Sequence, residues 1–254
     1  MSAYTEDFYS KRHERTLYSA NTILSIVLAA LPKVRSAADV GCGVRTWLSV
    51  MMEKGIKDVM GLDGEWVEAS MLVIPTKAFV KTDLNKSIRV RRRFDLAISL
   101  EVAEHLPAER AKGFVRDVTR LADFILFSAA VPFQGGRNHI NEQWQDYWVG
   151  LFAAEGYGAY DLIRPKIWND SKTPFWYRQN TLMFVKKERA KEIKFGPGEK
   201  ANNLSLYSVV HPDLYMRKVA GYKPPKKILQ AVLRDFYGKG KRRLKRMIRP
   251  EAKN

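Results

Sequence analysis

The stretch that decides the fold reads Asp39-Val40-Gly41-Cys42-Gly43-Val44-Arg45 and lies between an apolar segment and a segment with helical spacing. Glycines between a strand and a helix let a ligand approach backbone N–H groups with no Cβ atom in the way. Two glycines in one turn are a weak signal. A dinucleotide fingerprint would need a third glycine at position 46, which is Thr46. The turn therefore indicates a ligand site and argues against NAD.

Around this turn, apolar segments rich in β-branched residues alternate with segments of helical periodicity, such as 47–52 and 114–121. The predicted strands are residues 37–40, 59–63, 78–83, 94–100, 124–131, 157–163 and 181–185. This alternation predicts an α/β fold with a mostly parallel sheet covered on both faces. Residues 164–180 contain two prolines and no clear helical period, so we expect a loop there that joins an antiparallel pair at the sheet edge.

Acidic residues accompany four successive predicted strands. Asp63 ends the second strand, about twenty residues after the glycines, where an open α/β sheet places an acid that accepts two ribose hydroxyls. Asp83 follows the third strand, in position to accept from an adenine amino group, and Glu101 follows the fourth. Each acid alone is commonplace, but together with Asp39 they form a set in register after four strands.

As a set, these residues resemble the class I S-adenosylmethionine-dependent methyltransferases, over about residues 36–187. The resemblance implies a Rossmann-like, doubly wound, seven-stranded sheet with an antiparallel last strand, and S-adenosylmethionine as the cofactor. The family usually has a third glycine where this chain has Arg45, whose side chain would crowd the cofactor's carboxylate or pair with it. The implied cofactor-binding residues are Asp39, Gly41, Cys42, Gly43, Asp63, Gly64, Asp83, Leu84, Ser99, Leu100 and Glu101.

Structural alternatives stay open for several of these residues. Asp39 can merely orient the turn, and Asp63 can be a solvated acid at a strand end. Asp83 can form an ordinary turn in which it bonds its own backbone. Cys42 reads as a small filler and not a nucleophile, since no basic residue beside it obviously lowers its pKa.

The predicted acceptor site lies after the fifth strand, in residues 131–144, which are dense in polar, ring-bearing and glycine residues. His139 and Glu142 supply a potential general base and its orienting partner, as methyl transfer to an alcohol requires. The alternative is that His139 caps a helix that starts near Glu142. His105 is either a second base or a packed histidine at a helix start. This stretch, with 167–170 and 176–180, also resembles small-molecule methyltransferases of glycan clusters. No cluster of acids suggests a metal, so we expect none.

The two ends of the chain carry different signals. The apolar stretch 22–31 is about half as long as the roughly 20 residues of a membrane span, so it predicts an amphipathic helix and not a signal peptide. The resemblance suggests that the segment before it is a lid, within a helical N-terminal segment 1–35. The chain has a single cysteine, which fits a reducing compartment and a cytoplasmic location.

The positive charge is concentrated at the C-terminus. Residues 1–185 contain 24 Lys and Arg against 21 Asp and Glu, whereas residues 186–254 contain 20 against 6. We expect a methyltransferase domain over 1–187 and, over 188–254, a basic linker and helical extension. Apolar residues at helical spacing from Ile228 to Ile248 predict amphipathic helices that contact an anionic membrane surface, their own domain or, less favoured, nucleic acid.

The sequence thus predicts an enzyme that moves a methyl group from S-adenosylmethionine to a small-molecule or glycan acceptor, at a hydroxyl. One alternative is an RNA or protein methyltransferase recruited by the basic tail. No Asn/Asp-Pro-Pro-Tyr/Phe motif follows the fourth strand, which counts against methylation of nucleic-acid bases. A second alternative is an interaction protein that binds the cofactor without catalysis.

Overall fold

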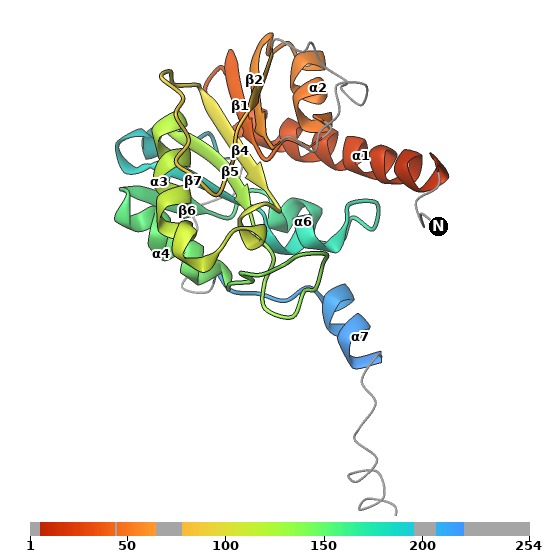
Figure 1. Ribbon diagram of the computed structural model, residues 1–254. Coiled ribbons are helices and arrows are strands. Elements are labelled where there is room, and N and C mark those ends of the chain that lie inside the picture. Colours follow the sequence, from red (N-terminus) through yellow and green to blue (C-terminus); the bar gives the residue numbers. More distant parts are fainter. Residues whose placement is uncertain (1–5, 44, 65–77, 196–206, 221–254) are drawn as a thin grey trace, which may run out of the picture. The chain divides into compact units, whose positions relative to one another are not determined.

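The computed structural model describes residues 6–43, 45–64, 78–195 and 207–220, with side chains described from Arg15 on (Figure 1). The chain divides into two compact units, Met1–His211 and Pro212–Asn254. The first unit contains the sheet and its covering helices. In the second, the structure describes one helix, α7 (Pro212–Ala220), with exposed Tyr215, Met216 and Val219 and with basic residues in its last turn.

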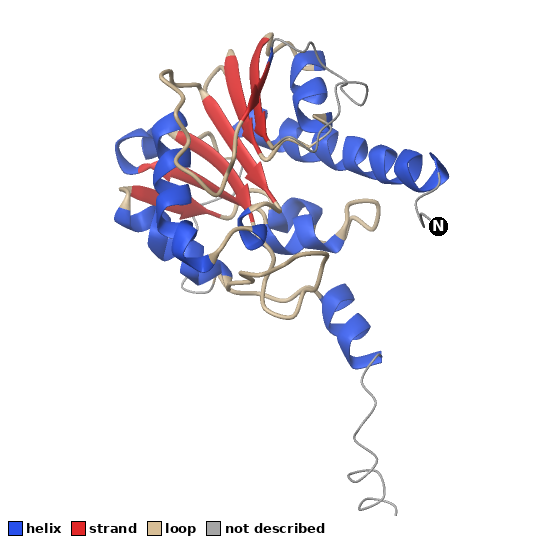
Figure 2. Ribbon diagram, viewed as in Figure 1, coloured by secondary structure: helices blue, strands red, loops and turns tan. Residues whose placement is uncertain are grey.

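Seven strands form one sheet in the first unit, in the order β3-β2-β1-β4-β5-β7-β6 (Figure 2). Strands β1 to β5 pair in parallel, and β7 is antiparallel to both β5 and β6. The bounds are β1 Ser36–Val40, β2 Asp58–Asp63, β3 Phe79–Lys81, β4 Leu96–Leu100, β5 Phe124–Ser128, β6 Tyr157–Tyr160 and β7 Leu182–Lys186. The doubly wound sheet with an antiparallel last strand is therefore confirmed.

The strand order reverses between β1 and β4. The chain runs outward from β1 through β2 to β3 and then returns, so that β4 pairs with β1 on its other side. Asp39 of β1 lies level with Gly61 of β2 and with Ile98 of β4. Loops that leave neighbouring strands in opposite directions open a crevice at the carboxyl ends of those strands, where open α/β sheets bind ligands. The glycine turn lies at this place.

Helices cover both faces of the sheet (Figure 2). One apolar cluster joins the sheet to α1 (Glu6–Ala30), α2 (Thr46–Glu53), α5 (Arg164–Ile167) and α6 (Phe175–Asn180). The other joins it to α3 (Ala111–Leu121) and α4 (Gln145–Ala154). Helix α1 buries Ala20, Ile23, Leu24 and Val27, which recur at helical spacing, so the predicted amphipathic helix is observed and is longer than predicted. Short 3-10 turns cover Ala103–His105, Ala108–Arg110 and Lys187–Glu192.

The structure corrects several sequence-based element bounds. Residues 164–180 are not simply a loop, because they contain α5 and α6. Strand β6 stops at Tyr160, and α5 follows with a proline in its first turn, where the missing N–H is not needed. Strand β5 ends at Ser128, and the buried residues 129–131 continue without strand pairing. Helix α4 begins at Gln145, later than the predicted start near Glu142.

Part of the predicted C-terminal extension packs on the first unit. The Arg164 guanidinium donates to the Tyr207 carbonyl oxygen at 2.8 Å, and the Gln145 amide donates to the Val209 carbonyl oxygen at 3.1 Å. The structure thus divides the chain after His211, not after residue 187. The predicted amphipathic helices between residues 228 and 248 lie outside the described residues. None of the helices described is both long and apolar enough to cross a membrane.

Candidate functional site at the carboxyl ends of the strands

The glycine turn is held by the Asp63 carboxylate. Its Oδ2 accepts the Gly43 N–H at 2.6 Å, and its Oδ1 accepts the Gly64 N–H at 2.7 Å, although only 4% of Asp63 is exposed. Gly41 adopts a φ of 85°, and a Cβ atom there would lie 2.3 Å from a methyl group of Val102. A side chain at Gly41 is therefore excluded both by backbone strain and by the close approach of the residue that follows β4.

Asp39 lies buried beside this turn. Its Oδ2 has no hydrogen-bond partner among the residues that the structure describes. Burial, and then the negative charge of Asp63, raise the pKa of the Asp39 carboxyl well above its usual value. A buried polar atom with no partner is costly, so an acceptor atom of this kind at a crevice is more typical of a ligand site than of a structural turn. The pure turn-orienting alternative leaves that atom unexplained.

Cys42 fills space and is not activated. Its Sγ would lie 2.7 Å from a Cβ atom at Gly61, so the thiol occupies the volume that the glycine leaves free. Burial, and then the charges of Asp39 and Asp63, raise the pKa of the Cys42 thiol, whereas the nearby Arg45 lowers it by less. A basic residue is thus close to Cys42, which the sequence did not reveal, but burial outweighs its effect.

Arg45 is the side chain that replaces the third glycine. It has a φ of 67°, which is unusual outside glycine, and its side chain is buried. The guanidinium lies 4.1 Å from the centre of the Phe79 ring of β3, a favourable cation–π contact. Within the described part of the chain, no carboxylate or carbonyl accepts a hydrogen bond from its Nε, Nη1 or Nη2, and the guanidinium lies near the Cys42 thiol. The chain thus places a buried cation without a carboxylate partner at the glycine turn.

The next two predicted cofactor residues, Asp83 and Leu84, differ in burial. Asp83 is exposed and forms the ordinary turn that the sequence left open as an alternative. Its Oδ1 accepts the Asn85 backbone N–H at 3.0 Å. That bond, and then the Asn85 side chain, lower the pKa of Asp83. Leu84 is buried in the core. Contact of Asp83 with an adenine amino group stays a prediction, and its carboxylate already has a structural use.

The end of β4 contributes buried polar groups on the other side of the crevice. The Ser99 hydroxyl is fully buried and has no partner, and Leu100 ends the strand. Glu101 follows with a φ of 56°. Its carboxylate accepts the Gln134 side-chain amide at 2.9 Å and the Asn180 side-chain amide at 3.1 Å. Burial raises the pKa of Glu101, and these hydrogen bonds oppose the shift.

A network of side-chain amides extends from Glu101 across the first unit. The Gln179 amide donates to Asn180 at 2.9 Å and to Gln134 at 3.3 Å, and its Oε1 accepts the His211 backbone N–H at 2.7 Å. The network thus joins the loop after β5, helix α6 and the segment 207–211. Fully paired networks of this kind hold side chains in one arrangement, so they define a rigid wall beside the end of β4.

The structure brings together the three residues that the sequence predicts to be catalytic, His139, Glu142 and His105. The Nδ1 of His139 lies 2.9 Å from Oε1 of Glu142, which also accepts the Gly135 N–H at 2.7 Å. The His105 ring meets the His139 ring edge to face, with centroids 4.8 Å apart. Helix α4 has Trp144 as its N-cap with no side-chain cap bond, so the capping alternative for His139 is wrong.

The loop that carries His139 is attached to the turn after β4. The backbone N–H groups of Ile140 and Asn141 both donate to the Glu104 carbonyl oxygen, at 2.9 and 3.0 Å. The Nδ1 of His105 lies 3.2 Å from the Asn138 carbonyl oxygen. Burial, and then the nearby His139, lower the pKa of His105. These contacts place two histidines, from turns 34 residues apart, at one point.

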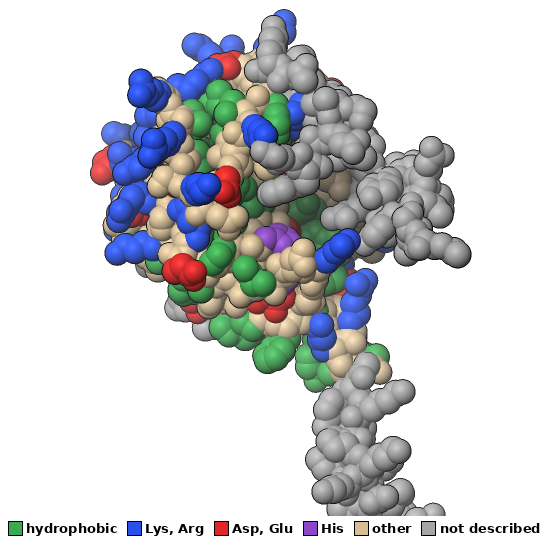
Figure 3. Space-filling view, viewed as in Figure 1, with side chains coloured by type: hydrophobic (Ala, Val, Ile, Leu, Met, Phe, Trp, Pro, Cys, Tyr) green, Lys and Arg blue, Asp and Glu red, His purple; other side chains and the backbone are tan. Residues whose placement is uncertain are grey.

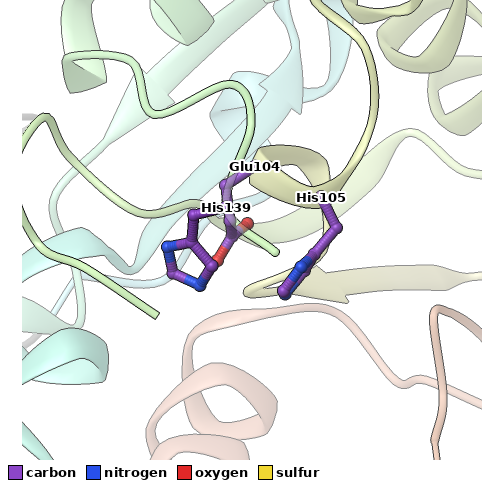
Figure 4. Close-up of side chains that lie close together, drawn as sticks. All are labelled: Glu104, His105 and His139. Atoms are coloured by element: carbon purple, nitrogen blue, oxygen red, sulfur yellow. The ribbon is translucent and has the colours of Figure 1, made fainter. Parts of the chain in front are cut away.

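Glu104 is the residue at this point that sequence reasoning did not select. Its side chain is completely buried, and among the residues that the structure describes no side chain pairs with either carboxylate oxygen. Burial, and then the charge of Glu101, raise the pKa of Glu104 well above its usual value, and nearby backbone amides only partly oppose this. Figure 4 shows its carboxylate beside the His139 ring, with the His105 ring facing them. Figure 3 shows histidine reaching the surface on this face of the protein.

Tyr177, in the stretch 176–180, packs inside the protein. Its ring packs against Trp47 with centroids 5.5 Å apart, and the side chain is buried. Trp168 and Trp176 are partly exposed. The large apolar side chains with more exposure on the loop after β5 are Phe133, Ile140 and Trp144.

The fold can now be compared with known proteins. No protein-family model and no curated protein sequence matches the chain, but solved structures do. The sugar N-methyltransferase KedS8 from Streptoalloteichus sp ATCC 53650 matches with a TM-score of 0.55 at 15% identity, over 73% of this chain and 96% of that one. DesVI from Streptomyces venezuelae matches with a TM-score of 0.52 at 14% identity, over 70% and 94%. This chain has the class I S-adenosylmethionine-dependent methyltransferase fold.

A third structure with this methyltransferase fold contains the cofactor itself. Magnesium protoporphyrin IX methyltransferase (ChlM) from Synechocystis PCC 6803, with bound S-adenosylmethionine, matches with a TM-score of 0.51 at 16% identity, over 73% of this chain and 86% of that one. The resemblance seen in the sequence is thus confirmed at the level of the fold. Identities this low leave the roles of individual residues to the geometry of this chain.

Within the methyltransferase fold, sequence reasoning missed the residues that tertiary contacts bring to the site. Gln134, Gln179 and Asn180 lie in stretches already singled out, but nothing in the spacing showed that they bond to Glu101. Glu104 directly precedes His105 in a turn after a strand, and that adjacency was a usable signal. The contribution of segment 207–211 had no local signal, because it follows a stretch that reads as linker.

Proposed function

We propose that this chain binds S-adenosylmethionine and transfers its methyl group to a hydroxyl of a small molecule or glycan. One observation carries the proposal. At the carboxyl ends of β1 and β4, the buried side chains of Asp39, Arg45 and Ser99 all have polar atoms that make no regular hydrogen bond with the residues that the structure describes. Unpaired buried polar atoms are rare in folded proteins, and a cluster of them of both charge signs fits a polar, zwitterionic ligand.

The residues of the crevice fit the cofactor's parts. Each Asp63 oxygen accepts a backbone N–H at the glycine turn, and a carboxylate at the end of β2 is the group that suits the two ribose hydroxyls of the cofactor. In front of Gly43, a Cβ atom would meet nothing within 4 Å, so the turn leaves open space. Asp39 is an acceptor for the amino group of the methionine part.

Arg45 gives this chain its own way to hold the cofactor's carboxylate. A guanidinium presents a planar set of donors that matches a carboxylate, and among the described residues no carboxylate pairs with Arg45. Of the two alternatives posed by the sequence, we therefore favour pairing over crowding. When bound, the cofactor supplies a methyl group on a positively charged sulfur.

The acceptor side lies at His139, Glu142 and His105. A hydroxyl must lose its proton as its oxygen bonds to the methyl carbon, so a neutral ring nitrogen beside it favours the reaction. When the Nδ1–H of His139 donates a hydrogen bond to Glu142, the Nε2 of the same ring keeps its lone pair and can accept a proton. KedS8, described as a sugar N-methyltransferase, supports a sugar-like acceptor but leaves the acceptor atom open. Exposed Phe133, Ile140 and Trp144 add apolar surface beside the site.

Calorimetry with full-length protein tests the binding half of the proposal. S-adenosylmethionine and its demethylated product, S-adenosylhomocysteine, should bind with one equivalent, and NAD should not. Removing the guanidinium in Arg45→Gly should weaken binding of the product at least tenfold. Failure of both ligands to bind the folded protein contradicts the proposal.

Turnover of methyl-labelled S-adenosylmethionine against sugar acceptors, phenols and bulk RNA tests the acceptor half. We expect label in a sugar or small molecule, and label only in RNA or protein would favour the alternative in which the basic tail recruits the substrate. His139→Ala should lower the turnover rate about 10²–10⁴-fold and leave cofactor affinity near that of the wild type. A loss of thermal stability that parallels the loss of activity would instead assign His139 a structural role.

A further inference from the structure

The cluster of Glu104, His105 and His139 has a chemistry that methyl transfer alone does not explain. One nitrogen of each histidine and a carboxylate oxygen of Glu104 all lie within 4.8 Å of one another. Two imidazoles and one carboxylate are a common donor set for first-row transition metals. We propose that these three side chains bind a divalent transition-metal ion, next to the proposed methyl-transfer site.

The buried carboxylate is the first support. Glu104 is 0% exposed, and within the described part of the chain no side chain or cation pairs with its oxygens; the backbone amides of Glu104 and Ala130 only partly offset the burial. Buried carboxylates in proteins are normally paired with donors or cations. Figure 4 shows this carboxylate next to the His139 ring, on the side where the His105 ring also lies. A cation at this point would give the carboxylate its missing partner.

The hydrogen bonds behind the two rings are the second support. Histidine ligands almost always donate their other ring N–H to a carboxylate or a backbone carbonyl, which sets the tautomer. Here the Nδ1 of His139 faces Glu142 at 2.9 Å, and the Nδ1 of His105 faces the Asn138 carbonyl oxygen at 3.2 Å. In the tautomer that donates from Nδ1 to these two acceptors, each ring has an Nε2 lone pair left for an ion.

The dimensions and access of the cluster suit an ion. Two ligand atoms at about 2.1 Å from one metal lie at most about 4.2 Å apart, so a separation of 4.8 Å has to shrink by at least about 0.6 Å. His105 is exposed and can rotate to close that distance, which also gives the ion a path from solvent. His139 has less freedom, because a Cβ at Gly136 would lie only 2.1 Å from its Nε2.

Three protein ligands leave open coordination positions on the ion. Ser99–Glu101, the segment expected beside the cofactor's sulfur, comes three residues before Glu104 and His105 along the same turn. A hydroxyl oxygen bound at an open position would therefore be oriented toward the methyl group and made more acidic by the ion. This deepens the proposed function, since it makes His139 a ligand and not a base, but binding of the ion does not depend on methyl transfer.

The sequence led us to expect no metal, because it shows no local cluster of ligands. Glu104 and His105 are adjacent, but His139 lies 34 residues later and reaches them only through the bonds between the two turns. The mixed nitrogen and oxygen donors favour Zn²⁺, Co²⁺ or Fe²⁺ over Mg²⁺ and Ca²⁺, which prefer all-oxygen sites.

Titration of tag-free, chelator-treated, full-length protein with Zn²⁺, Co²⁺, Mn²⁺ and Mg²⁺ tests the site. We expect one equivalent of Zn²⁺ or Co²⁺ at micromolar affinity or better, weaker Mn²⁺ and far weaker Mg²⁺. Glu104→Gln, His105→Ala and His139→Ala should each weaken binding at least tenfold. Glu142→Gln should weaken it about 10–100-fold by releasing the His139 ring. Glu109→Gln, which changes an exposed acid five residues from Glu104, is the matched control and should leave binding unchanged.

The visible spectrum of bound Co²⁺ gives a second readout, because ligand loss changes it even where affinity changes little. If the Glu104 variant unfolds, His105→Ala still tests the site, because the His105 side chain is exposed and its removal should leave the protein folded. No stoichiometric binding by the wild type, or binding that His105→Ala leaves unchanged, overturns the proposal. Calorimetry with S-adenosylhomocysteine on the same sample separates the two proposals: product binding without metal binding leaves the proposed function standing, and the reverse removes it. Methyl transfer at an undiminished rate in excess chelator would show that the reaction needs no ion, and His139 would then be assigned as the general base.

Discussion

Asp63→Asn tests how one carboxylate serves both the fold and the proposed cofactor. In the structure, Asp63 accepts backbone N–H groups from Gly43 and Gly64. Asparagine keeps one acceptor oxygen and presents an NH₂ group to the other N–H. A hydrogen bond to a charged group contributes about 1.5–3 kcal/mol, so the free energy of unfolding should fall by about that amount. Relief of the repulsion with Asp39 works in the opposite direction. For a domain of this size, the melting temperature should fall by about 3–12 °C.

The effect on the cofactor follows from the same hydrogen bonds. Losing one charge-assisted bond to a ribose hydroxyl should weaken binding of S-adenosylhomocysteine by about 10–150-fold. Titration calorimetry well below the melting temperature of the variant measures this without interference from unfolding.

Asp95→Asn is the matched control. Asp95 also accepts two backbone N–H groups, from Arg35 at 2.7 Å and from Ser36 at 3.0 Å, but it lies before β4, at the opposite end of the sheet. Its replacement should lower stability and leave product affinity unchanged. The reasoning fails if Asp63→Asn binds the product as tightly as the wild type, or if Asp95→Asn weakens binding equally.

Three further predictions concern other parts of the chain. Because burial raises the pKa of Asp39, its ionisation costs the folded state stability as pH rises from about 4 through the raised pKa. Asp39→Asn should thus be more stable than the wild type at pH 7 by a margin that shrinks toward pH 4, while binding the product more weakly; urea unfolding across this pH range measures the margin, and a constant margin contradicts the shift. Gly136→Ala should displace His139 and lower turnover at least tenfold, whereas Gly150→Ala, whose Cβ meets nothing within 4 Å, should not. A chain truncated after Pro224 should lose co-sedimentation with anionic vesicles at low salt, and equal binding by both lengths would exclude membrane contact through the tail.

The hydrophobic pattern was enough to predict the seven strands, and the family resemblance added the antiparallel last strand. Alternation and helical spacing record which side of a segment is buried, and that information is local. The prediction was least accurate in segments whose conformation is set by packing against distant parts of the chain. Residues 164–180 form two short helices because Arg164, Arg178 and Gln179 are buried against the segment 207–211. Segments without their own periodicity took their conformation from partners far away in the chain.

The acids after the strands were also readable from the sequence, because parallel strands bring their carboxyl ends to one edge of the sheet. Their individual uses were not. Asp63 holds the glycine turn, Asp83 bonds its own turn, and Asp39 is left unpaired, and only their different burial separates these outcomes. The family likeness was thus predictable from spacing, and the state of each carboxylate was decided by its surroundings.

The meeting of Glu104, His105 and His139 was decided by tertiary structure alone. A sequence shows that His139 and Glu142 are one helical turn apart, so their pairing was predicted and observed. It does not show that the loop after β5 donates two backbone hydrogen bonds to the carbonyl of Glu104. Residues 34 positions apart in the sequence meet only if the loops that carry them pack together. Here the loops follow β4 and β5, which are neighbours in the sheet, so the strand order brings them together.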